Sequence, residues 1–266
     1  MPVLRIEWVG PVAHVVLSRP EKINALNAEL IDAIVEAGGA VMRHGGCRAV
    51  VLSGEGRGFC SGIDLDGLRA ATGEGERSID IHTEVADGAN IAQHAVLLWQ
   101  SLPVPVIAAV HGVAFGGGLQ LALGADIRIV HPEARLALME TRWGLVPDMA
   151  GMTLLPDLVR PDVLAELVFT ARVFGGAEAL RLGIATELAD DPVAVALALA
   201  GRIAALSPDA IRAAKRLLRH GGPRAEILRA EAAEQSALFG TPNQREAVAA
   251  GMDKRPATFN DLDTQT

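Results

Sequence analysis

Two glycine-rich loops carry the residues of this chain that are best suited to chemistry. The first covers residues 58–65 (Gly-Phe-Cys-Ser-Gly-Ile-Asp-Leu), and the second covers residues 111–120 and contains the triplet Gly116-Gly117-Gly118. Three glycines at a helix entrance remove every Cβ, so a ligand atom can approach the backbone and meet free N–H groups. The helix dipole favours negative charge there, which suits a carbonyl oxygen that becomes an enolate oxyanion.

Other glycine-loop chemistries fit these residues less well. No Lys-Ser or Lys-Thr pair completes a phosphate-binding P-loop, and the dinucleotide-binding pattern G-x-G-x-x-G is absent. The serine-hydrolase elbow G-x-S-x-G is absent too. A glycine triplet on its own is more often a turn or a tight packing contact, so that structural alternative stays open at this point.

The loops lie between strands and helices that alternate along most of the chain. Apolar, β-branched runs predict strands at residues 12–17, 49–52, 104–110 and 126–130. Apolar residues at helical spacing predict helices at residues 27–42, 80–100, 116–124 and 161–170. Strands that alternate with helices indicate an α/β or mixed fold.

The last part of the chain differs, because almost all of it is compatible with helix. Helices are predicted at residues 193–206, 208–220 and 224–239, separated by Ser207-Pro208 and by Gly221-Gly222-Pro223. A helical tail of this kind often packs on its own core or on a neighbouring subunit. We therefore expect a core at residues 1–198 that carries the site and a helical region at residues 199–266.

Composition restricts the classes of partner and location. Half of the 266 residues are hydrophobic and none is Tyr, so Ala, Val, Leu and Ile must build one large core. The net charge of −8 argues against nucleic acid or an anionic membrane as the main partner. Cys47 and Cys60 have no metal-ligand or redox spacing, which predicts buried reduced thiols. No signal peptide or membrane-spanning stretch is evident, and we expect a cytoplasmic location.

Taken together, the loops and their neighbours resemble the crotonase, or enoyl-CoA hydratase/isomerase, superfamily. The resemblance covers nearly the whole chain, and its segments occur in the expected order. They are Leu17-Ser18-Arg19-Pro20 with Asn24-Ala25-Leu26, then Phe59 to Leu65, Pro105 to Gly118, Asp126-Ile127-Arg128 and Gly144-Leu145-Val146-Pro147.

The resemblance implies a fold, an assembly and a way of holding the substrate. The implied fold is a spiral of repeated ββα turns capped by a C-terminal helical region that makes trimers, often paired into hexamers. The implied substrate is an acyl-coenzyme A thioester, with no metal and no permanently bound cofactor. By position, the two N–H donors of the oxyanion hole would be those of Ile63 and Gly117.

The side chains depart from the hydratase pattern of the family. Hydratases use two glutamates to position and activate water, and the first of these positions holds Gln120 here, which cannot exchange a proton near neutral pH. The second matches Glu140. Asp148 stands where hydratases usually carry glycine and where dienoyl-CoA isomerases carry an acid. Two carboxylates at one thioester suit removing a proton from one carbon and returning one to another. The structural alternative is that Asp148 only caps a helix beginning at Met149.

The resemblance also implies contacts with coenzyme A, in the opening turn and the first loop. The matching positions are Lys22, Ala25, Ser61, Asp64 and Leu65. Lys254, with Arg255 and Phe259 beside it, is a candidate to reach the phosphates of coenzyme A from a neighbouring subunit. For Lys22 or Lys254 alone, ordinary solvated surface is the simpler explanation.

Three hypotheses for function follow, and the sequence favours the first. It is double-bond isomerisation by Glu140 and Asp148, with Gln120 as a hydrogen-bonding third residue. The second is a true 2-enoyl-CoA hydratase of fatty-acid β-oxidation type, in which Gln120 positions water. The third is an acyl-CoA-binding oligomer without catalysis, which would need only the two loops.

Overall fold

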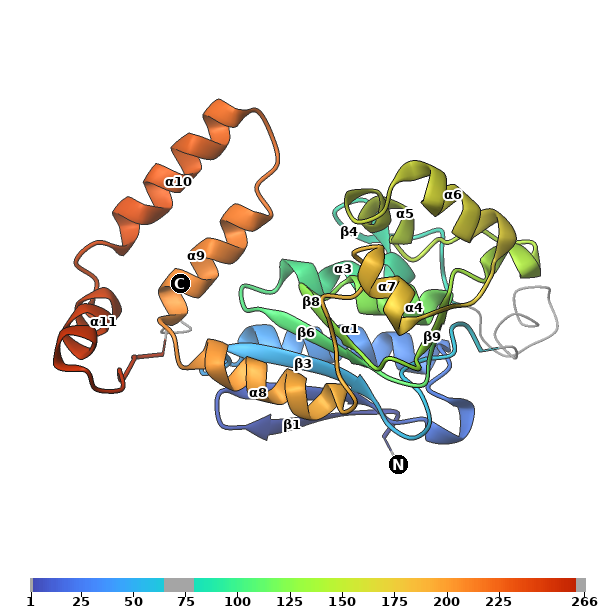
Figure 1. Cartoon of the computed structure of the whole chain (residues 1–266), viewed down its shortest axis with the longest axis horizontal. Coiled ribbons are helices and arrows are strands. Elements are labelled where there is room, and N and C mark those ends of the chain that lie inside the picture. Colours follow the sequence, from blue (N-terminus) through green and yellow to red (C-terminus); the bar gives the residue numbers. More distant parts are fainter. Residues whose placement is uncertain (1, 65–78, 262–266) are drawn as a thin grey trace.

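A six-stranded sheet forms the centre of the chain in a computed structural model, which describes residues 2–64 and 79–261 (Figure 1). Its strands, in spatial order, are β1 (Leu4–Val9), β2 (Val12–Leu17), β3 (Ala49–Gly54), β6 (Val106–Val110), β8 (Ile127–Val130) and β11 (Glu187–Leu188). β1 and β2 form an antiparallel hairpin, and every later strand joins the sheet in parallel. Parallel strands need crossover connections, and these connections carry the site.

A smaller sheet forms a second layer beside the first. It contains β7 (Val113–Phe115), β9 (Arg135–Ala137) and β10 (Phe174–Gly175), and isolated bridges at Cys60–Ala114 and Leu26–Ile63 extend the same pattern. The chain passes from β6 to β7 through Gly112, whose φ of +60° and close approach to Arg57 O exclude a side chain. The sequence strand, strand, helix then repeats, which confirms the predicted spiral of ββα turns.

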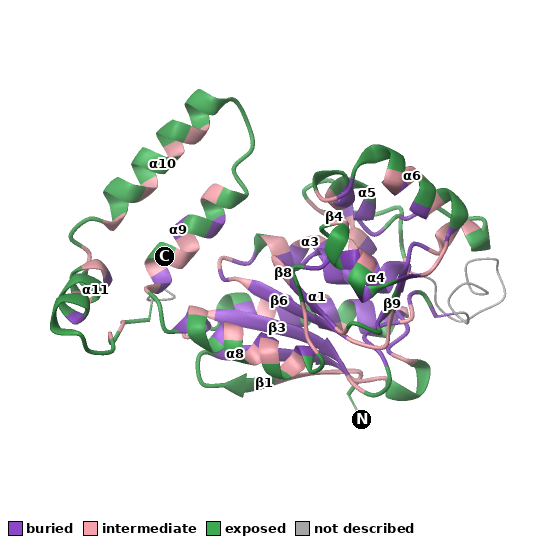
Figure 2. Cartoon of the chain, viewed as in Figure 1, coloured by how far each residue is buried: buried purple, intermediate pink, exposed green. Residues whose placement is uncertain are grey.

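Helices cover both faces of the large sheet. α1 (Ala28–Arg43) and α3 (Ile91–Ser101) pack on one face, and α8 (Pro192–Ala204) packs on the other. Alternate residues of β3 therefore enter two different cores, Val50 and Leu52 with α1, and Val51 with α8. Figure 2 shows the inner strands β3 and β6 as buried, as expected for parallel strands that are covered on both faces, whereas the edge strand β1 is half-buried or exposed.

Short helices surround the small sheet and build the lobe that contains α4 (Figure 1). They are α4 (Gly117–Leu123), η2 (Glu140–Trp143), α5 (Gly151–Leu154), η3 (Leu155–Asp157), α6 (Pro161–Thr170) and α7 (Gly176–Arg181), while η1 (Pro20–Lys22) belongs to the opening turn that follows β2. α4 is buried along its whole length, so it can hold the second glycine loop rigidly against the core.

The last three helices project from the other side of the sheet (Figure 1). They are α9 (Pro208–Leu218), α10 (Arg224–Leu238) and α11 (Pro242–Asp253). α9 is tied to the core because Lys215 Nζ donates to Val104 O at 2.8 Å and pairs with Asp126 Oδ2 at 2.7 Å. α10 has no buried residue. The expected boundary at residue 198 lies within α8, and the chain leaves the core after that helix.

One predicted helix was wrong over its first half. The segment from Asp80 to Gln100 begins as a hairpin of β4 (Glu84–Ala86) and β5 (Ala89–Asn90), and only α3 is helical. Asp87 and Gly88 both have positive φ, 48° and 81°, which is the backbone of a tight hairpin turn. Asn90 then caps α3 in a reciprocal pair of hydrogen bonds with Gln93.

Two features of the described residues bear on membranes and metals. No single helix there is long and apolar enough to cross a membrane, and α8 with α9 reaches that length only as a pair bent by 111°. Within residues 2–64 and 79–261, no three His, Cys, Asp or Glu side chains are grouped so that they could hold a metal ion.

Candidate active site

A cavity of about 520 Å³ lies where the opening turn, the two glycine loops and the segment after β9 meet. Its walls are mainly apolar, and few polar groups face it. Its lining residues are Lys22, Ala25, Leu26, Ser61, Gly62, Ile63, Asp64, Ile79, Phe115, Gly116, Gly117, Met139, Glu140, Trp143, Leu145, Asp148 and Met149. A mostly apolar cavity with a few convergent polar groups is the usual form of a small-molecule site.

The glycine triplet lets α4 begin in close contact with the first loop. A Cβ on Gly118 would lie 2.4 Å from Cys60 O, and one on Gly116, which has φ of +50°, would lie 3.0 Å from Glu140 Oε1. Gly116 N donates to Ala137 O at 2.8 Å, so the triplet is fixed to β9 as well. The triplet therefore does make tight packing contacts, as the structural alternative predicted, and Gly116 and Gly117 also line the cavity.

The first loop is bound to the opening turn by backbone hydrogen bonds. Ser61 N donates to Ile23 O, Leu26 N donates to Gly62 O, and Asp64 N donates to Leu26 O. Gly62 has φ of +90°, and a Cβ there would lie 2.6 Å from Phe115 O and 3.7 Å from Gly117 N. The two loops therefore touch. Within the described part of the chain, neither Ile63 N–H nor Gly117 N–H donates to a protein acceptor.

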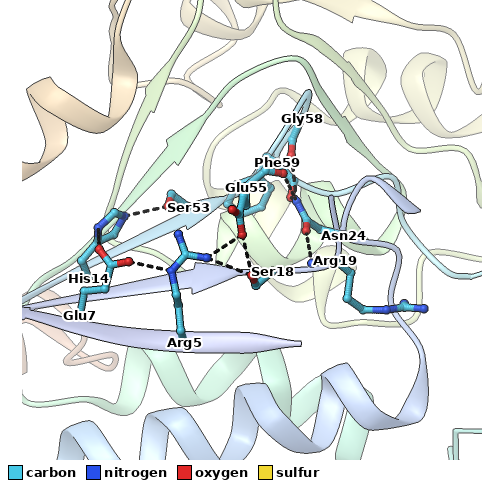
Figure 3. A network of polar contacts seen from close by, with 10 residues as sticks. All are labelled: Arg5, Glu7, His14, Ser18, Arg19, Asn24, Ser53, Glu55, Gly58 and Phe59. Atoms are coloured by element: carbon cyan, nitrogen blue, oxygen red, sulfur yellow. Dashed lines mark hydrogen bonds and ion pairs between the residues drawn. The ribbon is translucent and has the colours of Figure 1, made fainter. Parts of the chain in front are cut away.

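Asn24 holds the base of the first loop. Its Nδ2 donates to Gly58 O at 3.0 Å and to Phe59 O at 3.1 Å, and its Oδ1 accepts from Arg19 N at 2.9 Å (Figure 3). Asn24 is fully buried with φ of +54°, a conformation that asparagine tolerates better than most residues. One amide thus joins the opening turn to the loop that carries Ile63.

The same network continues to the edge of the large sheet (Figure 3). Glu55 Oε2 accepts from Ser18 Oγ and from Arg5 Nη1, both at 2.6 Å, and these contacts lower the pKa of the Glu55 carboxyl. On the face that α8 covers, His14 Nε2 lies 2.8 Å from Ser53 Oγ. These contacts anchor the start of the first loop and do not reach the cavity.

Arg19 and Asp64 form a buried ion pair under the opening turn. Arg19 Nη2 lies 3.0 Å from Asp64 Oδ2, and Arg19 Nη1 donates to Ala25 O. Asp64 lines the cavity, but part of its carboxylate is engaged in this pair. Asp64 therefore also holds Arg19, which in turn holds the backbone of Ala25.

Glu140 and Asp148 reach the cavity from either end of one irregular segment. Glu140 is the first residue of η2 and is half-buried, and Asp148 lies before α5 in contact with solvent. Burial raises the pKa of the Glu140 carboxyl above its ordinary value, and the charge of Asp148 raises it further, while a hydrogen bond from Gln120 lowers it. Loss of solvent on the cavity side also raises the pKa of Asp148. Such paired, perturbed carboxyls are typical of sites that move protons.

Gln120 lies behind Glu140 in the wall. The side chain is fully buried and does not line the cavity. Gln120 Nε2 donates to Glu140 Oε1 at 2.6 Å, and Gln120 Oε1 accepts from Met149 N and from Gly151 N, each at 2.9 Å. Glu140 Oε2 is buried and has no hydrogen-bond partner within the described residues.

The structure brings most of the predicted site residues to one place. Eight of them line the cavity: Lys22, Ala25, Ser61, Ile63, Asp64, Gly117, Glu140 and Asp148. Lys254 and Phe259 of the same chain do not line it; Phe259 O instead accepts from Arg48 Nη2 at 2.8 Å. Leu65 lies outside the described residues. Asp148 does not cap a helix, because α5 begins at Gly151 with Ala150 as its N-cap, so the capping alternative was wrong.

Sequence reasoning missed several residues that shape the cavity. Met139 and Met149 flank the two acids, and Arg19 and Asn24 hold the loops from below. Asn24 gave a usable signal, because an amide between apolar residues in a turn often bonds to backbone carbonyls. The two methionines gave none, since an apolar side chain next to an acid is as common in a core as in a pocket.

This chain is similar in sequence to a known family and to named relatives. A family model described as enoyl-CoA hydratase/isomerase matches residues 8–262. A "probable enoyl-CoA hydratase" of Mycobacterium bovis is 33% identical over 251 residues, covering 93% of this chain and 95% of that protein. The mitochondrial Delta(3,5)-Delta(2,4)-dienoyl-CoA isomerase of Mus musculus is 33% identical over 262 residues, covering 94% of this chain and 80% of that protein.

Solved structures of enoyl-CoA hydratases have a fold similar to that of this chain. An enoyl-CoA hydratase from Mycobacterium tuberculosis H37Rv has a TM-score of 0.86 and 26% identity, covering 98% of this chain and 100% of that one. An enoyl-CoA hydratase from Polaromonas sp. JS666 has a TM-score of 0.87 and 27% identity, covering 97% and 99%.

Proposed function

The chain belongs to the enoyl-CoA hydratase/isomerase family, and from that premise we propose that it moves a double bond along the acyl chain of an enoyl-CoA thioester. The chain is an enzyme of this family. Among the reactions of the family, its side chains favour isomerisation. The observation that carries the proposal is the pair of carboxyls, Glu140 and Asp148, that share one cavity and both have a raised pKa.

The thioester carbonyl is held by the two loops. Its oxygen accepts hydrogen bonds from Ile63 N–H and Gly117 N–H, which have no protein acceptor among the described residues. These donors are fixed before substrate arrives, so they stabilise the negative charge of an enolate without reorganisation. Lys22, Ala25 and Ser61, at the same cavity, contact the coenzyme A portion of the substrate.

Proton transfer between two carbons then moves the double bond. One carboxylate removes a proton from a saturated carbon next to the thioester carbonyl, or next to a double bond conjugated with it, and the electron pair enters an enolate whose oxygen the loops hold. The other carboxyl, which starts protonated, gives its proton to a different carbon of the same conjugated system. The substrate gains and loses one proton, and no water is consumed. Two carboxyls whose pKa values burial raises and whose charges repel are suited to holding one proton between them.

A hydratase with Gln120 as the water-positioning residue is the second candidate, favoured by relatives that carry that name. The position of Gln120 argues against it, because the amide is fully buried and bonds to Glu140, Met149 and Gly151. A non-catalytic acyl-CoA binder would not need Glu140 and Asp148 at the cavity.

We also propose that the chain assembles as a trimer or a pair of trimers through α9, α10 and α11. α10 is too polar and too exposed to stand alone, yet it carries Leu228, and Phe239 follows it, with exposed fractions of 56% and 66%. A neighbouring copy could then bring Lys254 and Phe259 to a cavity that they do not reach in their own chain. Sedimentation equilibrium tests the assembly: a monomer at micromolar concentration would contradict it.

Variants of the two acids test the proposed reaction. We would follow conversion of 2-enoyl-, 3-enoyl- and dienoyl-CoA thioesters by mass spectrometry in the wild type, Glu140→Gln and Asp148→Asn. The control is Glu133→Gln, which changes an exposed carboxyl on the loop before β9. Isomerisation should fall by roughly 10²–10⁴-fold in each acid variant and stay unchanged in the control. A wild-type product heavier by one water from a 2-enoyl-CoA would contradict the proposal.

A further inference from the structure

The geometry points to Gln120 as a positioning residue that fixes both carboxyls of the site, because it holds Glu140 through Oε1 and the backbone beside Asp148 through Met149 N–H. This inference rests on the proposed function, in which Glu140 and Asp148 move the proton. It gives the amide a role different from orienting water or substrate.

The orientation of the Gln120 amide is set by its surroundings. Two backbone donors, Met149 N–H and Gly151 N–H, point at Oε1 from 2.9 Å. The oxygen must face them, so Nε2 must face Glu140, to which it donates at 2.6 Å. Gly151 leaves the space that this arrangement needs, because a Cβ there would lie 2.6 Å from Gln120 Oε1.

A neutral amide meets both demands at this position without gaining or losing a proton. An ionised glutamate could accept from the two N–H groups but could not donate to Glu140, and it would place a second negative charge beside it. An apolar side chain would leave two buried N–H donors without an acceptor. Glutamine is therefore matched to a neighbouring carboxylate, as an ionised glutamate would not be.

The amide gives the two oxygens of Glu140 different environments. Oε1 is occupied by Nε2 and lies over the bare Cα of Gly116, where a Cβ would approach it to 3.0 Å. Oε2 is buried and has no partner within the described residues. Glu140 lines the cavity, and the hydrogen bond to Oε1 holds its carboxyl there in one orientation.

The same amide sets the place of the second acid. Asp148 immediately precedes Met149, whose N–H is held by Gln120 Oε1. One side chain from α4 therefore ties together η2, which begins with Glu140, and the segment that brings Asp148 to the cavity. Loss of the amide should disturb the separation of the two carboxyls as well as the ionisation of Glu140.

The test uses the full-length protein and compares Gln120→Met with Gln93→Met. Methionine keeps the length of the side chain and removes its hydrogen bonds. Gln93 is a matched control, because its amide accepts from Asn90 N at 3.0 Å and lies outside the cavity lining. Carboxyl ¹³C titration by NMR, with Glu140 assigned from the Glu140→Gln spectrum, and pH–rate profiles of isomerisation are measured for each.

The expected results separate positioning from general damage. In Gln120→Met, Glu140 should titrate at higher pH, because its ionised form has lost a hydrogen bond, and the acidic limb of the kcat profile should move the same way. We expect kcat to fall about a hundredfold while KM changes little, since the amide does not touch substrate. Gln93→Met should change neither titration nor kcat, even if it lowers thermal stability. Rescue by Gln120→Glu is not expected.

Either readout can overturn the inference. Glu140 titrating at the wild-type pH in Gln120→Met would refute it, as would an unchanged pH–rate profile. If the wild type moves no double bond but the Glu140 titration shifts as expected, the positioning role stands and the proposed reaction fails.

Discussion

Replacing Gly118 with alanine should disable the oxyanion hole while leaving both acids in place. A Cβ at Gly118 would lie 2.4 Å from Cys60 O and 2.8 Å from Cys60 Sγ. Real Cβ contacts essentially never fall under 3.0 Å, so the start of α4 and the first loop must separate by at least about 0.6 Å. Gly117 N–H is on one side of that separation and Ile63 N–H is on the other.

The size of the effect follows from the hydrogen bonds that such a shift lengthens. Losing one oxyanion donor costs roughly 10²–10³ in kcat, about 2.7–4 kcal/mol of transition-state stabilisation. Overpacking the contact should also lower the free energy of unfolding by about 1–3 kcal/mol. A folded Gly118→Ala protein should therefore bind coenzyme A nearly as well as the wild type and turn over substrate at least about a hundredfold more slowly.

Gly201→Ala is the matched control. Gly201 lies in α8 with helical backbone and nothing within 4 Å of its ideal Cβ, so alanine should leave kcat unchanged and slightly raise stability. The assay is kcat at saturating substrate, with far-ultraviolet circular dichroism and thermal melting to show that each variant is folded. A folded Gly118→Ala enzyme with kcat within about threefold of the wild type would refute the reasoning about the loops.

Three further predictions concern ionisable groups. Burial raises the pKa of Glu140, so its ionisation costs stability as pH rises through the folded pKa. Glu140→Gln should therefore raise the free energy of unfolding, measured in urea, at pH 8, and this gain should disappear towards pH 4. A gain that does not depend on pH would contradict the prediction. Burial raises the pKa of Cys60 to about 12, so at pH 8 only about 10⁻⁴ of the thiol is ionised and a disulfide reagent should label it only after unfolding. Lys215→Met should cost about 1–3 kcal/mol in urea unfolding, because Val104 O loses its donor while Asp126 keeps its ion pair with Arg219. The absence of a measurable loss would show that α9 is held by other contacts.

The parts of the fold that sequence predicted best are those in which local pattern and tertiary burial agree. α6 was predicted to the residue, and α1 begins after the cap residue Asn27, whose side chain accepts from Leu30 N. β2, β3 and β6 were found because strands buried on both faces are continuous apolar runs. The hairpin before α3 was missed because its strands have only three and two residues, and only the Asp87-Gly88 pair indicated a turn.

The parts of the site that the backbone forms could be predicted from the sequence. The contacts between side chains that are far apart in the sequence could not. The glycine triplet and Gly62 could be found from sequence, since each position excludes a Cβ for a reason that glycine alone meets. That Gln120 bonds to Glu140 required the structure, because twenty residues and two strands separate them. The hydrogen bonds from Met149 N and Gly151 N, which orient the amide, leave no trace in residue type.

The most direct test of proton transfer without hydration is the position of deuterium in the product. The wild-type enzyme would be incubated in D₂O with a dienoyl-CoA and a 3-enoyl-CoA, and the products would be analysed by tandem mass spectrometry. A displaced double bond with deuterium at a carbon of the conjugated system, and no mass increase from water, is the predicted result. A 3-hydroxyacyl-CoA product, or recovery of both substrates with neither deuterium nor a moved double bond, would contradict the account.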